Sequence, residues 1–145
     1  AQADCPARAD FPDGGRFPCA AMAQELVCVD DVASARYNTL FDAATVPTPD
    51  WSSKETMPRK DSLYRLLVVV DHNVSPPAPG AGSCIFLHCE ERPDYASTGC
   101  TTMSFTRLRE LVGWLDPAAS PLLLQAPASE LPRFAPALGL KGITP

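Results

Sequence analysis

The sequence predicts a single domain of the mostly β or α+β class. Short apolar runs of strand length, rich in β-branched residues, occur at 63–70 and 84–88. Only one segment, 105–115, clearly repeats its apolar residues at helical spacing. The chain has 145 residues, and a domain of that length buries roughly 68–70% of its unfolded surface. A core of its own is therefore expected for residues 1–145 taken as one domain.

The first third of the chain carries the weaker signals. Residues 1–24 are rich in Ala, Pro, Asp and Gly and contain two cysteines. They predict an irregular N-terminal arm tied down by a disulfide, with a frayed terminus as the alternative. Residues 26–29, Leu-Val-Cys-Val, have the composition of a short strand. No steady period runs from 30 to 50, so a loop with one short helical turn is expected there.

The middle of the chain predicts two strands followed by the main helix. The apolar runs 63–70 and 84–88 are separated by a loop rich in Asn, Ser, Pro and Gly. Ser104 is a favourable N-cap residue for the helix at 105–115. Asp116-Pro117 is expected to end that helix.

Beyond the helix the chain becomes rich in proline. The run 121–126, Pro-Leu-Leu-Leu-Gln-Ala, predicts a further strand, and Ser129 is expected to cap a last short helix. Neither an internal repeat nor a boundary to a second domain is visible in the sequence.

Charge and hydropathy exclude several classes of function. The net charge is −5 with scattered basic residues, which argues against a nucleic-acid partner because such binding neutralises phosphates with Lys and Arg. The apolar runs fall short of the ~20 residues that cross a bilayer, so an integral membrane protein is not expected. The sequence contains no zinc-type spacing of His and Cys. Neither a metal nor a diffusible cofactor is expected.

Six cysteines and the first residues, AQADCP, favour an exported protein. The small residues and the missing initiator Met are typical of a mature end after removal of a signal peptide, which predicts a periplasmic or secreted location. Connectivity is not deducible from spacing. We predict that the bridges involve Cys5, Cys19 and Cys28, which flank the arm. Cys84 is predicted to be a buried strand residue.

The segment from 82 to 104 carries the chemistry. It places His88 at the end of an apolar strand and then a Ser-Thr-Gly-Cys turn before the helix. A cysteine nucleophile needs a base to form its thiolate and donors to hold an oxyanion. Gly99 permits a tight turn and close approach of a substrate. The nearby helix N-terminus at Ser104 is expected to lower the pKa of the Cys100 thiol.

Strand geometry selects Cys100 among the cysteines near His88. Cys84 shares a face with His88, but four residues of strand separate them by roughly 13 Å. Cys89 points to the opposite face. Cys100 returns from the following loop and is free to approach the imidazole.

These motifs resemble the L,D-transpeptidase catalytic domain, also called the YkuD-like family. The resemblance rests on Phe86-Leu87-His88 and Ser97-Thr98-Gly99-Cys100, and extends over roughly residues 60–127. The segments LYRLLVVVDHN and PGAGSCIFLH are similar to a short, divergent branch from Gram-negative bacteria, and PLLLQAP to the closing strand of that domain. The fold implied is a β-sandwich or barrel-like sheet with one main helix after the catalytic cysteine.

The activity implied by the resemblance is acyl transfer in cell-wall biogenesis and the control of cell shape. His88 takes the thiol proton, and Cys100 attacks an amide carbonyl of a peptidoglycan stem peptide. The resulting thioester passes to an amine of a second stem and forms a crosslink. Gly99 and Thr98 shape the oxyanion turn. Carbapenem-type β-lactams are the inhibitors that such a family implies.

This chain departs from the common family pattern around the cysteine. Eleven residues separate His88 from Cys100, fewer than in most members. Thr98 stands where a His is usual, and Thr101-Thr102 where an Arg is usual. These differences concern the recognition of the stem more than the thioester chemistry.

Further polar residues near the motif are candidates for substrate binding, each with a structural alternative. His72 would line the cleft or satisfy loop backbone groups. Ser83 would orient His88 or serve only as a strand-edge residue. Tyr95 and Ser97 would touch substrate or pack the loop before Cys100. Thr101 completes the set of expected binding residues.

Three other functions remain open at this stage. The same site with water as acceptor would be an L,D-carboxypeptidase or endopeptidase. A papain-like cell-wall peptidase is disfavoured because its Cys precedes its His in the chain. A non-catalytic, disulfide-stapled cell-wall binding module would hold Cys100 in a bridge.

Overall fold

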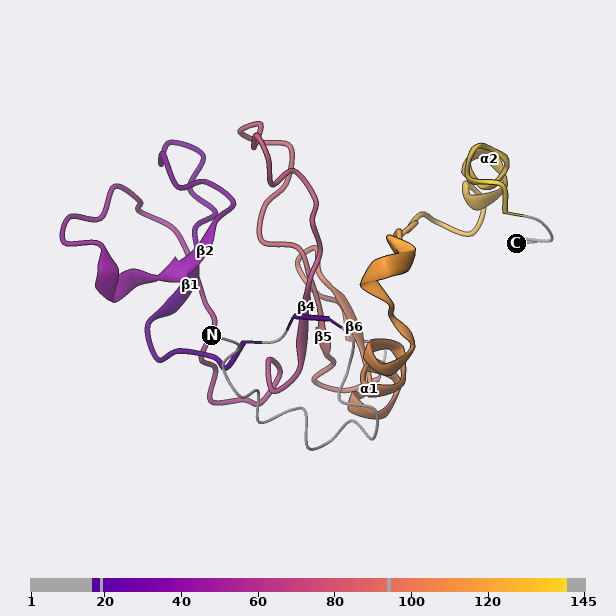
Figure 1. Cartoon of the computed structure of the whole chain (residues 1–145), viewed down its shortest axis with the longest axis horizontal. Coiled ribbons are helices and arrows are strands. Elements are labelled where there is room, and N and C mark those ends of the chain that lie inside the picture. Colours follow the sequence, from indigo (N-terminus) through magenta and orange to yellow (C-terminus); the bar gives the residue numbers. More distant parts are fainter. Residues whose placement is uncertain (1–16, 19, 94, 141–145) are drawn as a thin grey trace.

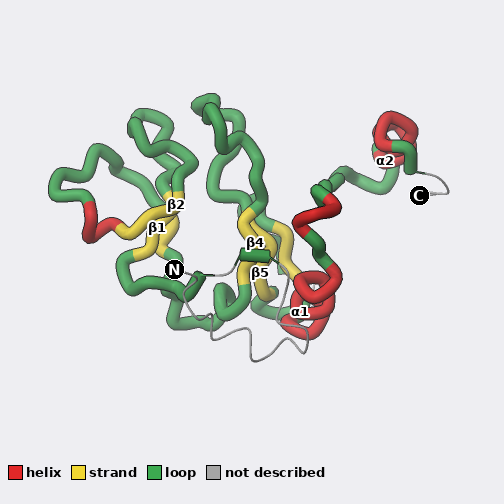
Figure 2. The backbone as a smooth tube through the Cα atoms, in the orientation of Figure 1, coloured by secondary structure: helices red, strands yellow, loops and turns green. Residues whose placement is uncertain are grey.

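The computed structural model describes residues 17–18, 20–93 and 95–140, and shows two small open sheets followed by a helix and a C-terminal extension (Figure 1). Each sheet has three strands, in the orders β2-β1-β3 and β4-β5-β6. Long loops connect these short strands (Figure 2). The mixed α+β class expected from the sequence is therefore confirmed. The predicted arm at 1–24 falls largely outside the described residues.

The first sheet is built around β1 (Leu26–Cys28), which pairs antiparallel with β2 (Leu40–Asp42) and with β3 (Glu55–Thr56). Buried, β-branched Val27 makes β1 the central strand. The strand predicted at 26–29 is thus confirmed. The segment 30–50 is mostly loop, and its short helical turn is a 3₁₀ turn at Ala43–Thr45.

The second sheet is built around β5 (Phe86–Cys89), which pairs antiparallel with β4 (Leu67–Val69) and parallel with β6 (Thr101–Met103). All four residues of β5 are buried. Both predicted strands exist in shorter form than expected. The Thr-Thr-Met strand β6 was not predicted, because its polar residues give no apolar alternation.

Helix α1 (Phe105–Trp114) covers one face of this second sheet (Figure 1). It begins at Ser104, whose side chain accepts a hydrogen bond from the Arg107 backbone N–H, so the predicted N-cap is confirmed. Leu108 packs in a cluster with Leu66, Leu87 and Cys89. Because side chains alternate along a strand, Leu87 and Cys89 share this face while Phe86 and His88 lie on the other.

Leu108 anchors the helix, and its side chain is 0% exposed. Replacing Leu108 with Ala should destabilise the protein by about 2–5 kcal/mol, because a buried cavity remains where the side chain was. Urea unfolding followed by circular dichroism measures this. Leu122→Ala, at a side chain that is 82% exposed, is the matched control and should change stability by less than about 0.5 kcal/mol.

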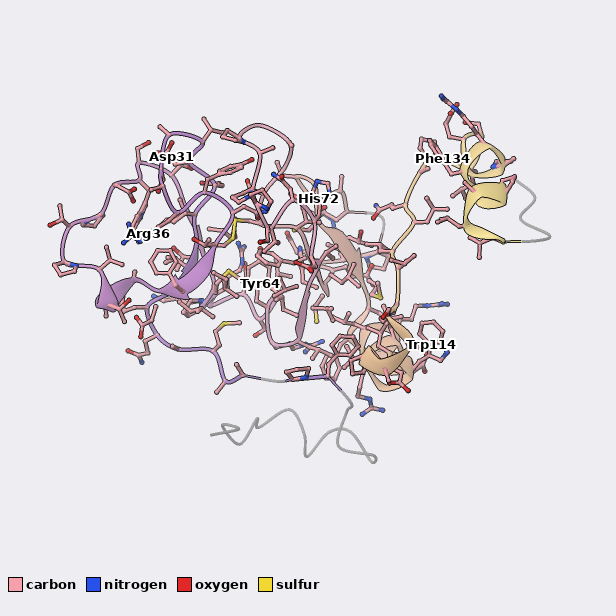
Figure 3. The ribbon with its side chains drawn as sticks, turned by 45° about the horizontal axis from the view of Figure 1, so that its top comes forward. Asp31, Arg36, Tyr64, His72, Trp114 and Phe134 are labelled. Carbon is pink, nitrogen blue, oxygen red and sulfur yellow. A yellow bond between two sulfur atoms is a disulfide. The ribbon has the colours of Figure 1, made fainter. Side chains whose placement is uncertain are left out.

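A second apolar cluster lies on the face of β5 turned away from α1. Its buried members are Cys28, Met57, Tyr64 and Phe86, and both Cys84 and Cys100 pack against them. The Cys28–Cys84 disulfide ties β1 of the first sheet to the segment just before β5 of the second. Figure 3 shows it as a bond between two sulfur atoms.

The disulfide corrects the interpretation of Cys84. Cys84 lies outside the strand, because it precedes β5 and has a positive φ of 55°. It is also bridged to Cys28. That kink turns its sulfur toward Cys28, in the other sheet. Cys28 is bridged as expected, whereas Cys5 and Cys19 lie outside the described residues.

The strand predicted at 121–126 does not form. A 3₁₀ turn at Pro117–Ala119 ends in the left-handed residue Ser120, and the chain then continues into the C-terminal extension (Figure 1). Leu122 and Leu123 are exposed, and within the described part of the chain no strand pairs with this run. An apolar run forms a strand only where a neighbouring strand hydrogen-bonds to its backbone N–H and C=O groups.

The chain ends in a short helix α2 (Leu131–Phe134) and a 3₁₀ turn at Ala135–Leu138. The last helix was expected, but its N-cap is Glu130 rather than Ser129. In the described residues, no helix has the length and apolar character needed to cross a membrane.

Candidate active site

A pocket of about 780 Å³ lies where the two sheets meet. Its walls come from the end of β5, the turn before β6, the loop before β5, and residues of β3 and the segment after it. Residues from both sheets and their loops line it, including Glu55, Arg59, Tyr64, Ser83, Cys84, His88, Tyr95, Ser97, Thr98, Gly99, Cys100 and Thr102. The volume falls within the range of pockets for small ligands, about 300–1,000 Å³.

His88 lies in β5, and Cys100 comes directly before β6, the parallel neighbour of β5. His88 is paired in register with Thr102. Cys100 lies just before β6 and packs against the cluster that contains Phe86, which shares its face of β5 with His88. Cys100 and His88 both line the pocket. The structure therefore places the two residues singled out from the sequence at one pocket.

Cys100 carries a free thiol in the structure, and so does Cys89. The two differ in their surroundings. Cys89 is buried in the cluster beneath α1, whereas Cys100 is partly buried at the pocket. Only Cys100 is placed to react with a molecule in the pocket. Its sulfur lies 3.7 Å from the carbonyl oxygen of Cys84.

His88 is oriented by the backbone. It is 7% exposed, and its Nδ1 lies 2.8 Å from the carbonyl oxygen of Cys89. A carbonyl only accepts hydrogen bonds, so Nδ1 carries the proton. In the neutral ring, Nε2 is then left as the acceptor, which is the form that a general base requires. The Tyr64 ring packs edge-on against the imidazole at 4.9 Å between centroids.

Tyr64 belongs to a group of residues that sequence reasoning did not find. Its hydroxyl donates a hydrogen bond to Glu55 Oε1 at 3.0 Å. The Arg59 guanidinium lies over its ring, 5.1 Å from the centroid, and also pairs with Asp61 and Glu55. Burial, reinforced by Glu55, raises the pKa of Tyr64, so the phenol stays neutral. Tyr64 lies beside His88 because the chain leading into β4 pairs with β5, where the Cys89 N–H donates to the Leu63 carbonyl at 3.0 Å. Glu55 reaches Tyr64 from β3 of the first sheet.

The Cys100 thiol has a raised pKa, contrary to the expectation from the helix terminus. Burial is the main cause, and the negative charge of Glu55 adds to it. A hydrogen bond from the Phe86 backbone N–H acts in the opposite direction. The strand β6 separates Cys100 from the start of α1, and the field of a helix terminus falls off within about one turn. The resting thiol is therefore protonated at neutral pH.

The Glu55 charge predicts a change in thiol reactivity. In Glu55→Gln the repulsion of the thiolate is removed, so the pKa of Cys100 should fall and its alkylation should begin at lower pH. Iodoacetamide labelling of the Cys100 peptide across pH 6–10, read by mass spectrometry, measures the midpoint. Glu91→Gln is the matched control, because Glu91 also lines the pocket but does not perturb this thiol. An unchanged midpoint in Glu55→Gln would contradict the assignment.

The turn before Cys100 has the geometry that its glycine predicts. Gly99 adopts a φ of +136°, a backbone conformation that residues with a side chain rarely adopt. Ser97 donates a hydrogen bond from its hydroxyl to the carbonyl of Cys100, which closes the turn. Thr98 lines the pocket beside them. The turn thus holds Cys100 directly before the first residue of β6.

The candidate binding residues divide into two groups. Ser83, Tyr95 and Ser97 line the pocket. His72 instead bonds the carbonyl oxygen of Ala81 through Nε2 at 2.8 Å, inside its own loop. Thr101 contacts the side chain of Gln125. Neither His72 nor Thr101 lines the pocket.

Asn38 is a further residue that the sequence did not reveal. Its amide nitrogen donates to the carbonyls of His72 and Asn73, at 2.9 and 2.7 Å. Its amide oxygen accepts from the Cys84 backbone N–H at 2.8 Å. A buried asparagine in the loop between β1 and β2 therefore fixes both ends of the loop that leads into the pocket wall. Partners 34 to 46 residues away along the chain leave no local pattern.

The arrangement supplies a thiol, an oriented imidazole and a glycine turn in one pocket. Within the described part of the chain, no group of three or more His, Cys, Asp or Glu side chains is placed to bind a metal ion. Comparisons of the chain with protein-family models, with curated proteins and with solved structures find no match.

Proposed function

We propose that this protein is a cysteine acyltransferase of the L,D-transpeptidase type that acts on peptidoglycan stem peptides. The observation that carries the proposal is that the free Cys100 thiol and His88 line one pocket, with Cys100 directly before the strand that pairs with β5. A nucleophile and a base in one pocket are the minimum that acyl transfer requires. The choice of stem peptides rests on the resemblance of the His88 and Cys100 motifs to that family.

The first half-reaction makes a thioester. His88 Nε2 accepts the thiol proton, and the Cys100 sulfur attacks an amide carbonyl of the donor stem. The turn at Gly99 and Cys100 supplies backbone N–H groups for the oxyanion. The tetrahedral intermediate then collapses, the C–N bond breaks, and His88 returns the proton to the departing amine. Because burial raises the pKa of the thiol, the base is essential for the first step.

The second half-reaction releases the acyl group. A neutral amine of an acceptor stem attacks the thioester, His88 takes its proton, and the C–S bond breaks to give an amide crosslink. The same protein chain provides every group that handles a proton. Carbapenem-type β-lactams would be attacked by the same thiolate and act as inhibitors.

The fold and location that go with this activity are part of the proposal. The YkuD-like fold implied by the resemblance has one main helix after the catalytic cysteine, and here α1 follows Cys100 with β6 between them. A periplasmic or secreted location agrees with the Cys28–Cys84 disulfide, because such bridges persist in oxidising compartments.

Hydrolysis is the second candidate. A pocket of about 780 Å³ is of the size that holds one small ligand, and a hydrolase needs only the donor stem and water. Its products would be shortened stems rather than crosslinks. The third alternative, an inert binding module, expects Cys100 in a bridge, whereas Cys100 has a free thiol.

The test is mass spectrometry of purified protein incubated with peptidoglycan fragments. Crosslinked dimers, or exchange of the terminal residue of the stem, are the expected products. Shortened stems without dimers would replace the transferase by the hydrolase. If neither product forms while iodoacetamide still labels Cys100 in folded protein, the acyltransferase proposal is wrong.

His88 should be needed for the chemistry and not for the fold. His88→Ala removes the base, and we expect acyl transfer to fall by roughly 10²–10⁴-fold, with part of the loss recovered at high pH where the thiol ionises by itself. Rates of dimer formation across pH 6–10 measure this. His72→Ala is the matched control, because this second histidine does not line the pocket and should leave the rate within a few-fold.

A further inference from the structure

Three cysteines lie together at one apolar cluster, two of them at the pocket, and the proposed catalysis uses only Cys100. Cys28 and Cys84 form a disulfide, and Cys100 is free. All three belong to or pack against the apolar cluster that contains Tyr64 and Phe86. The Cys100 sulfur lies 3.7 Å from the carbonyl oxygen of Cys84. The free thiol therefore lies beside one half of the bridge.

The position of Cys84 exposes it to this thiol. Cys84 and Cys100 both line the pocket, whereas Cys28 is 3% exposed. Cys84 and Cys100 also lie just outside the strands β5 and β6, so neither is held within a strand ladder. The nearby Gly82 and Gly99 have positive φ values. Residues with a side chain rarely adopt this backbone conformation.

The other free cysteine cannot take part. Cys89 lies in the cluster with Leu108, under helix α1. It is on the opposite face of β5 from the pocket, because it follows His88 directly. The described residues thus contain one free thiol that faces the disulfide and one that is separated from it by the sheet.

We propose that Cys28, Cys84 and Cys100 form a thiol–disulfide exchange switch. The Cys100 thiolate attacks the Cys84 sulfur, a Cys84–Cys100 bond forms, and the Cys28–Cys84 bond breaks. Cys28 leaves as a thiolate and takes up the proton that Cys100 gave up. One thiol and one disulfide are present before and after, so the exchange needs neither an oxidant nor a reductant.

The exchange has two consequences. It releases the tie between the two sheets, because Cys28 belongs to β1. It also converts Cys100 from a thiol to a disulfide, which cannot act as a nucleophile. If the proposed acyltransferase function holds, the switch turns the enzyme off without chemical damage to its nucleophile. The sulfur connectivity itself does not depend on that function.

Trapping of thiols in the wild-type protein tests the exchange. Folded protein is equilibrated at pH 8.5 without reductant, treated with N-ethylmaleimide, and digested for mass spectrometry. We expect label on Cys28 together with a Cys84–Cys100 peptide, with label on Cys28 at least about tenfold above the level in Cys100→Ser. Label confined to Cys100, with an intact Cys28–Cys84 peptide after prolonged incubation, would overturn the proposal.

A variant tests the geometry directly. Cys28→Ser frees Cys84, and oxidation with glutathione disulfide should then give a Cys84–Cys100 bridge with release of two molecules of glutathione. In the matched double variant Cys28→Ser with Cys100→Ser, glutathione should stay attached to Cys84. Glutathione recovered on both Cys84 and Cys100 of folded Cys28→Ser would contradict the switch. If Cys28→Ser does not fold, the wild-type trapping still decides.

The test separates this proposal from the proposed function. The mapping uses no peptidoglycan, so a protein without transferase activity still gives an answer. Conversely, a fixed Cys28–Cys84 bridge in a protein that forms crosslinks would reject the switch and leave the acyltransferase in place.

Discussion

Replacing Cys100 with Ala should reduce formation of stem-peptide crosslinks by at least about 10³-fold, because among the described residues no other free thiol lines the pocket. The fold should persist, since Cys100 is only partly buried and forms no bridge. The measurement is the rate of dimer formation from purified fragments, with circular dichroism as the check on folding. Residual crosslinking within tenfold of wild type would mean that another nucleophile acts.

Cys89→Ala is the matched control for this prediction. It removes the same chemical group from the same sheet, but on the face buried beneath α1. The backbone carbonyl of residue 89, which orients His88, is retained in the variant. We therefore expect a modest loss of stability and a rate within a few-fold of wild type. Equal losses in both variants would indicate a structural effect in place of a nucleophilic one.

Removing the Cys28–Cys84 bridge should cost about 4 kcal/mol of unfolding free energy at 25 °C. The bridge closes a loop with a sequence separation of 56, and the estimate follows from the chain entropy that such a cross-link removes from the unfolded state. Urea unfolding of Cys28→Ala combined with Cys84→Ala measures it. A loss below about 1 kcal/mol would show that the packing of the two sheets holds without the bridge.

The bridge should also keep the pocket walls together, because it joins the two sheets that contribute to those walls. Alkylation of Cys100 reports on this. In the double variant without the bridge, burial of the thiol should weaken and its labelling by iodoacetamide should speed up. Leu108→Ala, which weakens the opposite face of the sheet, serves as a control for general destabilisation. Equally faster labelling of Cys100 in both variants would show that general destabilisation, and not loss of the bridge, exposes the thiol.

Elements whose signals are local were predicted well. Helix α1 was found because its cap and its apolar face lie within about a dozen consecutive residues. The strands β1, β4 and β5 were found because they are short β-branched or apolar runs. The pairing of His88 with Cys100 as candidates followed from strand alternation and the Gly99 turn, and both line one pocket.

Elements that depend on a distant partner were predicted poorly. The polar strand β6 exists because β5 offers an edge, and the apolar run 121–126 is not a strand because no edge meets it. The partner of Cys84 was missed because bridge connectivity depends on spatial proximity. Glu55 contacts Tyr64 from the other sheet, and Tyr64 contacts His88 through strand pairing, so neither contact leaves a local spacing in the sequence.

By itself, the sequence determined the class of the fold, the main helix and the two residues that carry the proposed chemistry, because each depends on neighbours in the chain. Only the tertiary structure decided the disulfide, the pocket and the raised pKa of the Cys100 thiol. Desolvation and the Glu55 charge, which cause that raised pKa, arise from groups far apart in sequence. Burial and electrostatic fields depend on distances in space, and only the folded chain sets those distances.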